Sequence, residues 1–328
     1  MIDFGIIGTS PITHQFIKAA LQTNKYQFRA VFSRNHDTAE SFAKPYEKVD
    51  LFTDFSSFLS SEIDLVYIAS PNSLHYQQAK AVLLAGKHAI VEKPMVSTPA
   101  EFEDLRQIAS EKGLFLFEAA RNFQEESFQT IRQFLADKSI IGGHFSYAKY
   151  SSKMPELLAG NTPNIFSADF SGGALMDLGV YAVYAAIGLI GAPHTARYVA
   201  QQLPSSVDLN GLGQLVYENF TVGIQAGKNM TSHLPSEIYT TEGTLTLNAC
   251  QHISSAIFTK NNGEQYQLPL ASKDQSMIEE AMHFAQVIEE ANHPLADQWL
   301  DVASDVHRTL YLMRQDAGIT FKADTHEN

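Results

Sequence analysis

The chain has 328 residues, of which 45% are hydrophobic and 18% charged, a composition typical of a globular protein. Its length favours two domains, because a single hydrophobic core stops growing at about 250–300 residues. The formal net charge of −13 and the lack of clustered Lys and Arg argue against nucleic acid as a partner. The single Cys250 excludes an intrachain disulfide and fits a reducing compartment.

The longest apolar run, LGVYAVYAAIGLIGA (178–192), is too short and too interrupted by glycine to span a bilayer. It predicts a buried helix and no membrane partner. The residues after Met1 show no charged segment followed by an apolar core, so no secretory signal is expected. We therefore expect a cytoplasmic protein.

Apolar strands and amphipathic helices alternate through the first third of the chain. Such alternation predicts a parallel sheet buried on both faces, in a doubly wound Rossmann-like α/β domain that ends near residue 121. The expected strands are 3–8, 28–33, 64–70, 87–93 and 114–119, and the expected helices are 11–22, 37–46, 74–86 and 98–113.

The pattern then changes. Consecutive strands over about 196–270, with a hairpin signal at Asn262-Gly263, predict a largely antiparallel open sheet. The remaining expected elements are helices at about 123–136, 177–191, 275–291 and 298–316 and a strand at 143–151. The second domain is therefore α+β, and the division is 1–121, a dinucleotide-binding domain, and 122–328, a domain for substrate binding and dimerisation.

The segment GTSPIT (8–13) joins the first strand to the first helix. Such a turn suits a pyrophosphate, held by backbone N–H groups and the helix N-terminus. Gly8 keeps the tight turn, but Ser10 and Thr13 stand where small residues are usual. Ser10 costs little if its φ is negative and more if its φ must be positive. We predict that dinucleotide binding survives.

Three further stretches hold candidate site residues, and each has a plain structural alternative. In ASPNSLH (69–75), Asn72 and His75 are also ordinary turn and cap residues. In VEKP (91–94), Lys93 is either a surface charge or an ammonium that stabilises a developing alkoxide. In SGGALMDLGVY (171–181), Asp177 and Tyr181 share a helix face, but Asp177 also fits a helix cap.

Taken together, GTSPI, ASPNSLH, AGKHAIVEKP and SGGALMDLGVY, in this order and spacing, resemble the Gfo/Idh/MocA oxidoreductases. The similarity is greatest to the dimeric dihydrodiol dehydrogenase and glucose–fructose oxidoreductase branch and covers nearly the whole chain. It implies a two-domain NAD(P)-dependent dehydrogenase that transfers a hydride between nicotinamide C4 and a carbinol or carbonyl of a sugar, polyol or small diol. It also implies a homodimer formed through the second domain's sheet.

The resemblance assigns catalytic roles to Lys93, Asp177 and Tyr181. Lys93 would contact the reacting oxygen, Asp177 would orient the substrate, and Tyr181 would exchange its proton. The residues implied to line the cofactor are Gly8, Thr9, Ser10, Pro11, Ile12, Ser33, Arg34, Ser70, Pro71, Asn72, His75, Glu92 and Lys93.

The second strand ends in Ser33-Arg34, where an NAD site usually has Asp or Glu for the ribose hydroxyl. A hydroxyl and a guanidinium suit a 2′-phosphate, so NADP(H) is favoured, with NAD(H) and an exposed turn arginine as alternatives. Residues 121–124, RNFQ, depart from the family pattern and leave the substrate open.

A different class of function is a cofactor-binding regulatory protein on the same scaffold, which Ser10 and Thr13 keep open. Lys93, Asp177 and Tyr181 argue against it, because a sensor does not need them. The scattered His residues predict no metal site.

Overall fold

The computed structural model describes residues 1–271 and 276–326, which form two compact units. The first unit comprises Met1–Ala119 and Met277–Asp301, and the second comprises Ala120–Ser276 and Val302–Asn328. The chain thus passes from one unit to the other within two residues of the division at 121. It also returns to the first unit near its end, which the sequence-based division did not include.

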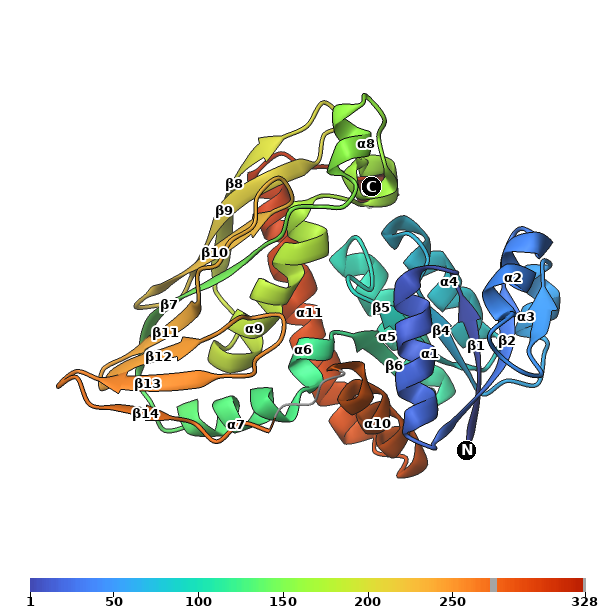
Figure 1. Ribbon diagram of the computed structural model, residues 1–328, viewed down its shortest axis with the longest axis horizontal. Helices are drawn as coiled ribbons and strands as arrows, with labels where there is room; N and C mark the ends of the chain where they lie inside the picture. The colour runs from blue at the N-terminus through green and yellow to red at the C-terminus, as the bar shows by residue number, and fades with distance from the viewer. Residues whose placement is uncertain (272–275, 327–328) are drawn as a thin grey trace. The chain divides into compact units, whose positions relative to one another are not determined.

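The first unit is built on a six-stranded parallel sheet in the order β3-β2-β1-β4-β5-β6 (Figure 1). This is the strand order of a dinucleotide-binding fold, and it confirms the predicted α/β class. The strands are β1 (Ile2–Ile7), β2 (Tyr26–Phe32), β3 (Asp50–Phe52), β4 (Leu65–Ile68), β5 (His88–Glu92) and β6 (Leu116–Ala119). The helices between them are α1 (Pro11–Gln22), α2 (His36–Ala43), α3 (Phe55–Leu59), α4 (Asn72–Leu84) and α5 (Pro99–Lys112).

Aromatic side chains fill one side of this sheet. The Phe16 ring of α1 stacks on Tyr67 of β4 at a centroid distance of 3.9 Å. Helix α10 (Ser276–Glu289) contributes Phe284, which stacks on Phe117 at 4.5 Å. The Tyr26 hydroxyl donates a hydrogen bond to the Ala281 carbonyl oxygen over 2.8 Å. A helix from the end of the sequence therefore completes the first unit's core.

The second unit holds an eight-stranded sheet in the order β14-β13-β12-β11-β7-β10-β9-β8. Neighbouring strands are antiparallel except β7 and β10, which are parallel, so the predicted largely antiparallel sheet is confirmed. The strands are β7 (Ile140–Ala148), β8 (Thr195–Gln202), β9 (Asp208–Val216), β10 (Thr221–Gly227), β11 (Ser236–Thr240), β12 (Gly243–Leu247), β13 (Ala256–Lys260) and β14 (Gln265–Gln267). The helices are α6 (Arg121–Gln124), α7 (Glu126–Leu135), α8 (Met154–Leu158), α9 (Val180–Ile190) and α11 (His293–Asp316), the last belonging to this unit from Val302 onward.

Helix α9 packs against β7 and β10 on one face of this sheet (Figure 1). The apolar segment Ala168–Ile190 that contains it has the length and composition of a membrane span, yet most of it is buried inside the structure. It is thus the core helix of the second unit, as the apolar run predicted. The other face of the sheet carries Val199 and Leu212, two exposed apolar residues on neighbouring strands.

Candidate active site

The turn after β1 requires glycine at its first position. Gly8 has a φ of +102°, and a Cβ atom there would lie 2.5 Å from the Ala69 carbonyl oxygen. Ser10 has a φ of −84°, so its side chain is accommodated without backbone strain. It occupies the N-cap position of α1 and makes no side-chain capping hydrogen bond there. This turn fits a pyrophosphate, because the helix N-terminus is not covered by a capping side chain.

Thr13, the second departure from the usual turn, is fully buried where α1 meets the sheet. Its hydroxyl oxygen lies 3.4 Å from that of Ser10. The two unexpected residues of the turn therefore contact each other, and neither is placed in a strained conformation.

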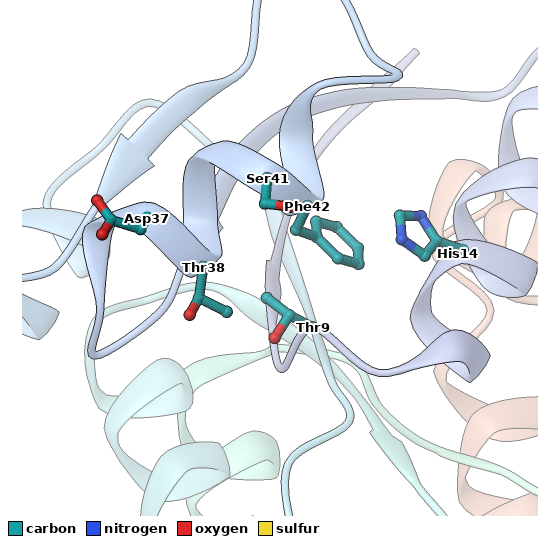
Figure 2. Close-up of a pocket in the computed structure, with 6 residues that line it drawn as sticks. All are labelled: Thr9, His14, Asp37, Thr38, Ser41 and Phe42. Carbon is teal, nitrogen blue, oxygen red and sulfur yellow. The ribbon is translucent and has the colours of Figure 1, made fainter.

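A cavity of about 420 Å³ lies beside this turn, between α1 and the start of α2 (Figure 2). Thr9 and Thr38 line it, and the His14 ring stacks on Phe42 at 4.0 Å. Figure 2 shows the Asp37 carboxylate pointing away from the other lining side chains. The cavity is therefore lined by hydroxyls and rings, with its acidic residue turned outward.

Ser33 and Arg34 lie in the segment that joins β2 to α2, directly before the residues that line this cavity. The Asn35 side chain caps α2 by accepting a hydrogen bond from the Thr38 N–H over 3.0 Å. Arg34 is exposed, and within residues 1–271 and 276–326 it forms no ion pair with a carboxylate. Its guanidinium is thus available to an anionic ligand.

The loops after β4 and β5 are joined by His75. Its imidazole lies between two carbonyl oxygens, that of Pro94 2.9 Å from Nδ1 and that of Ser70 2.8 Å from Nε2. Burial lowers the pKa of His75, although the two carbonyl groups act in the opposite direction. Because the ring is hydrogen-bonded to both loops, it fixes their positions relative to each other.

Lys93 follows β5 and is half-buried, and its peptide bond to Pro94 is cis. The preceding Glu92 is buried and accepts hydrogen bonds from the Tyr67 hydroxyl over 2.5 Å and from the Lys93 N–H over 3.2 Å. Since β1, β4 and β5 are neighbours in one parallel sheet, their following turns share its carboxyl edge. The first unit thus brings together the glycine turn, the segment Ser70–Pro71–Asn72 and Lys93.

In the second unit, Asp177 lies in a π-helical turn, Leu175–Gly179, directly before α9. Turns of this kind often occur at functional sites. Another carboxylate lies at the start of this turn: Asp208 accepts a hydrogen bond from the Leu175 N–H over 2.7 Å. Asp177 instead pairs with Lys228, whose ammonium donates a hydrogen bond to Asp177 Oδ2. The Leu175 N–H at this helix start is thus bound by Asp208, while Asp177 takes part in an ion pair.

Asp208 explains the second glycine in SGGALMD, Gly173. It is buried on β9 and also accepts a hydrogen bond from the Tyr198 hydroxyl over 2.7 Å. A Cβ atom on Gly173 would lie 2.2 Å from Asp208 Oδ1. Burial raises the pKa of Asp208, while its hydrogen bonds act in the opposite direction.

Tyr181 lies near the start of α9 and is almost fully buried. The Arg121 guanidinium lies 5.6 Å from its ring centroid, and the Tyr147 ring meets it edge-on at the same centroid distance. Asn122 donates hydrogen bonds to the backbone oxygens of Tyr181 and Cys250. Arg121 and Asn122 of the RNFQ segment therefore contact the predicted proton-exchanging residue.

Asp177 opens onto a cavity of about 450 Å³ in the second unit. Its wall combines aromatic rings, hydroxyl groups and two ammonium groups, which suits a ligand with several hydroxyl groups. The lining side chains include those of Tyr147, Lys149, Tyr150, Asp177 and Lys228.

Sequence reasoning missed Lys228 and Asp208. Lys228 follows the apolar strand β10 and reads as an ordinary strand-end lysine, and Asp208 begins a strand. Their partners are 51 and 33 residues away, and no local spacing links them.

A doubly wound dinucleotide-binding unit followed by an α+β unit is the architecture of a class of nicotinamide-dependent oxidoreductases that act on CH–OH and carbonyl groups. Comparison with protein families agrees. The oxidoreductase family with an NAD-binding Rossmann fold, Gfo/Idh/MocA, matches residues 2–120, and its C-terminal domain matches residues 128–246. The chain belongs to the Gfo/Idh/MocA family.

Full-length relatives support this assignment. The chain is 34% identical to an uncharacterized oxidoreductase, YgjR, of Escherichia coli, with 99% of each chain covered. It is 31% identical to the scyllo-inositol 2-dehydrogenase (NADP(+)) IolU of Bacillus subtilis, again over 99% of each. Among solved structures, a levoglucosan dehydrogenase in complex with NADH and levoglucosan superposes with a TM-score of 0.84 at 18% identity, covering 97% of each chain. That likeness shows the shared fold.

Proposed function

We propose that the enzyme prefers NADP(H) and interconverts the carbinol and carbonyl forms of a sugar, polyol or small diol. Relatives with these activities support the proposal: a scyllo-inositol 2-dehydrogenase (NADP(+)) of Bacillus subtilis and a D-xylose 1-dehydrogenase (NADP(+)) of Haloferax volcanii. A mouse trans-1,2-dihydrobenzene-1,2-diol dehydrogenase, 25% identical over 98% of this chain, extends the range to small diols.

The residues that follow β2 support the preference for NADP(H). Ser33 and Arg34 replace the acidic residue that would accept hydrogen bonds from a ribose 2′-hydroxyl. Arg34 is exposed and forms no ion pair with a carboxylate of the described chain. A guanidinium in this state binds a 2′-phosphate through charge-assisted hydrogen bonds. Thr9 and Thr38, which line the neighbouring cavity, carry hydroxyl groups that can add neutral hydrogen-bond donors.

The remaining cofactor contacts follow from the fit of the glycine turn. We assign the pyrophosphate to the turn and the α1 N-terminus, and the nicotinamide half to the loops after β4 and β5. The residues so assigned are Gly8, Thr9, Ser10, Pro11, Ile12, Ser70, Pro71, Asn72, Glu92 and Lys93, with His75 supporting the two loops. The bound nicotinamide supplies or accepts the hydride.

The chain's own side chains handle the substrate oxygen. Lys93 donates a hydrogen bond to that oxygen and stabilises the negative charge that develops on it. Tyr181 gives or takes its proton, and the Arg121 guanidinium lies near its ring. Asp177 accepts a hydrogen bond from a substrate hydroxyl and fixes the position of the reacting carbon.

The regulatory alternative rested on Ser10 and Thr13. Ser10 has a negative φ, and Thr13 is accommodated in the core beneath it. Neither residue therefore gives a reason to expect lost cofactor binding.

We further propose a cytoplasmic homodimer. The single, buried Cys250 suits a reducing compartment. The outer face of the second unit's sheet carries Val199 and Leu212 as directly opposed cross-strand neighbours, 78% and 60% exposed. Exposed apolar side chains gathered on a sheet face are typical of a protein interface.

The test is fluorescence titration of the protein with NADPH and NADH, for the wild type, Arg34→Ala and Arg29→Ala. Arg29 lies nearby on β2 but pairs with Asp3, so its variant is the matched control. Arg34→Ala should weaken NADPH binding by about 10-fold or more and leave NADH binding nearly unchanged, while Arg29→Ala changes neither. Equal loss for both nucleotides would contradict the 2′-phosphate contact.

A further inference from the structure

Two backbone hydrogen bonds hold the main chain of Lys228 in place. It follows β10 directly, its N–H donates to the Leu209 carbonyl oxygen over 2.9 Å, and its carbonyl oxygen accepts from the Ser151 N–H over 2.8 Å. Both hydrogen bonds tie this residue to neighbouring segments of the second unit. The start of its side chain is therefore fixed.

The ammonium of Lys228 is buried behind Asp177. Its side chain is 3% exposed, whereas that of Asp177 is 35% exposed and opens onto the cavity. Nζ donates to Asp177 Oδ2 and lies 5.8 Å from the Phe166 ring centroid. A buried ammonium is unfavourable unless it is paired. The carboxylate of Asp177 therefore offsets the cost of burying Lys228.

This pairing has two consequences for Asp177. One carboxylate oxygen is bound from behind, which restricts the rotation of the side chain within the π-helical turn. The charge of the carboxylate is also balanced locally, so that it does not oppose negative charge developing on a nearby substrate oxygen. Both effects prepare Asp177 to accept a hydrogen bond from a neutral hydroxyl group.

We propose that Lys228 is a positioning residue of the active site, which holds Asp177 ionised and correctly oriented to receive a hydroxyl of the sugar or polyol substrate. The proposal deepens the proposed function and rests on it. Lys228 acts through Asp177, and its removal affects the reaction only as far as Asp177 takes part.

The experiment is a double-mutant cycle with Lys228→Met, Asp177→Asn and the double variant. Steady-state kcat and KM are measured with NADP(H) and a polyol that the wild type turns over. Each single variant should lose about 10- to 100-fold in kcat/KM, with most of the loss in kcat, as for residues that orient a group at a reaction centre. The double variant should lose no more than Asp177→Asn alone, because the two residues act as one unit.

Lys228→Arg should recover part of the activity, because it keeps the positive charge behind Asp177. Lys260→Met is the matched control: Lys260 also pairs with a carboxylate of the second unit, Glu264, but its side chain at the end of β13 is 43% exposed. It should retain wild-type kinetics. NADPH titration of every variant tests the first unit and should give unchanged affinities.

A second readout does not depend on turnover. The ¹³C chemical shift of the Asp177 carboxyl group, assigned by comparison with Asp177→Asn, reports its protonation. In Lys228→Met this group should protonate at higher pH than in the wild type. Among the described residues, the titratable groups on the elements packed around it include Tyr147, Lys149 and Tyr150 of the cavity wall, Tyr181 on α9 and the buried Asp208.

The proposal is overturned by wild-type kinetics in Lys228→Met, by multiplicative losses in the double variant, or by an unchanged Asp177 titration. A wild type that turns over no sugar, polyol or diol, with the Asp177 titration shifted as expected, would instead contradict the proposed function. The ion pair between Lys228 and Asp177 would then be real but would have no role in the proposed reaction.

Discussion

The backbone of Gly8 lies against the end of β4, so close that a Cβ atom on residue 8 would be 2.5 Å from the Ala69 carbonyl oxygen. The φ of Gly8, +102°, independently disfavours any L side chain. Two separate constraints therefore keep glycine here. The close approach also holds the turn against the carboxyl edge of the sheet, where the N-terminus of α1 can bind a phosphate.

Gly8→Ala should abolish cofactor binding or weaken it by at least about 100-fold. The left-handed backbone alone costs about 1–2 kcal/mol, and the overlap with Ala69 forces the turn away from β4. The measurement is NADPH titration together with thermal unfolding. Gly86→Ala is the control, because Gly86 also has a positive φ, +79°, but a Cβ atom there meets nothing within 4 Å. Normal NADPH affinity in Gly8→Ala would show that the turn does not hold the cofactor.

Gly173→Ala isolates a second close approach. Its Cβ atom would lie 2.2 Å from Asp208 Oδ1, and its φ is +117°. Gly191 has a similar φ, +109°, but open space around it. We expect Gly191→Ala to lower the free energy of unfolding by about 1–2 kcal/mol. Gly173→Ala should cost at least about 2 kcal/mol more, because it also disturbs the buried hydrogen bonds of Asp208. Chemical denaturation measures both, and equal losses would show that the Asp208 contact is relaxed at little cost.

Much of this architecture is predictable from the sequence. Helix α1 begins and ends at the predicted residues, and the capping box of Thr98 and Glu101 begins α5 after the expected cap. In long helices such as these, the spacing of apolar residues and the capping residues predict the element from the local sequence alone. β3 and α3 were missed, because three and five residues are too few to show a period.

The candidate site was predictable only in part. The individual residues Lys93, Asp177 and Tyr181 stand in recognisable motifs, but the partners that define their environment do not. Lys228 reaches Asp177 only because β10 and the π-helical turn pack together. The π-helical turn itself breaks the 3.6-residue spacing from which a shared face for Asp177 and Tyr181 was inferred. Tertiary contacts of this kind leave no local pattern.

Stability should fall as the pH is lowered through the range in which histidine is protonated. Burial lowers the pKa of His75, His88 and His144 below the ordinary value of 6.5. Below about pH 6.5 the unfolded chain therefore binds more protons than the folded chain, and the free energy of unfolding decreases. The loss is at most about 1.4 kcal/mol per pH unit for each group.

The measurement is chemical denaturation between pH 7.5 and 5. His75→Gln should reduce the dependence on pH, because one of the buried imidazoles is gone, at the cost of a lower stability at pH 7.5. His36→Gln, a change at an exposed residue of α2, is the control and should leave the slope as it is. A slope that is the same in the wild type and His75→Gln would show that His75 does not contribute to the acid sensitivity.

Leu212→Lys should convert the proposed homodimer into monomers. Leu212 and its cross-strand neighbour Val199 are exposed on the outer face of the sheet, and an ammonium at the centre of an apolar contact has no partner to compensate its desolvation. Because the change lies on the exposed face, the free energy of unfolding of the isolated chain should change by no more than about 0.5 kcal/mol.

Light scattering after size-exclusion chromatography measures the mass of each variant. Leu158→Lys is the control, because Leu158 is also exposed, at 74%, but lies on α8 and not on the sheet. It should remain a dimer. A Leu212→Lys variant that stays dimeric would place the interface on another surface, and a wild type that is monomeric at all concentrations would exclude the dimer altogether. If dissociation in Leu212→Lys leaves kcat unchanged, each protomer carries a complete active site.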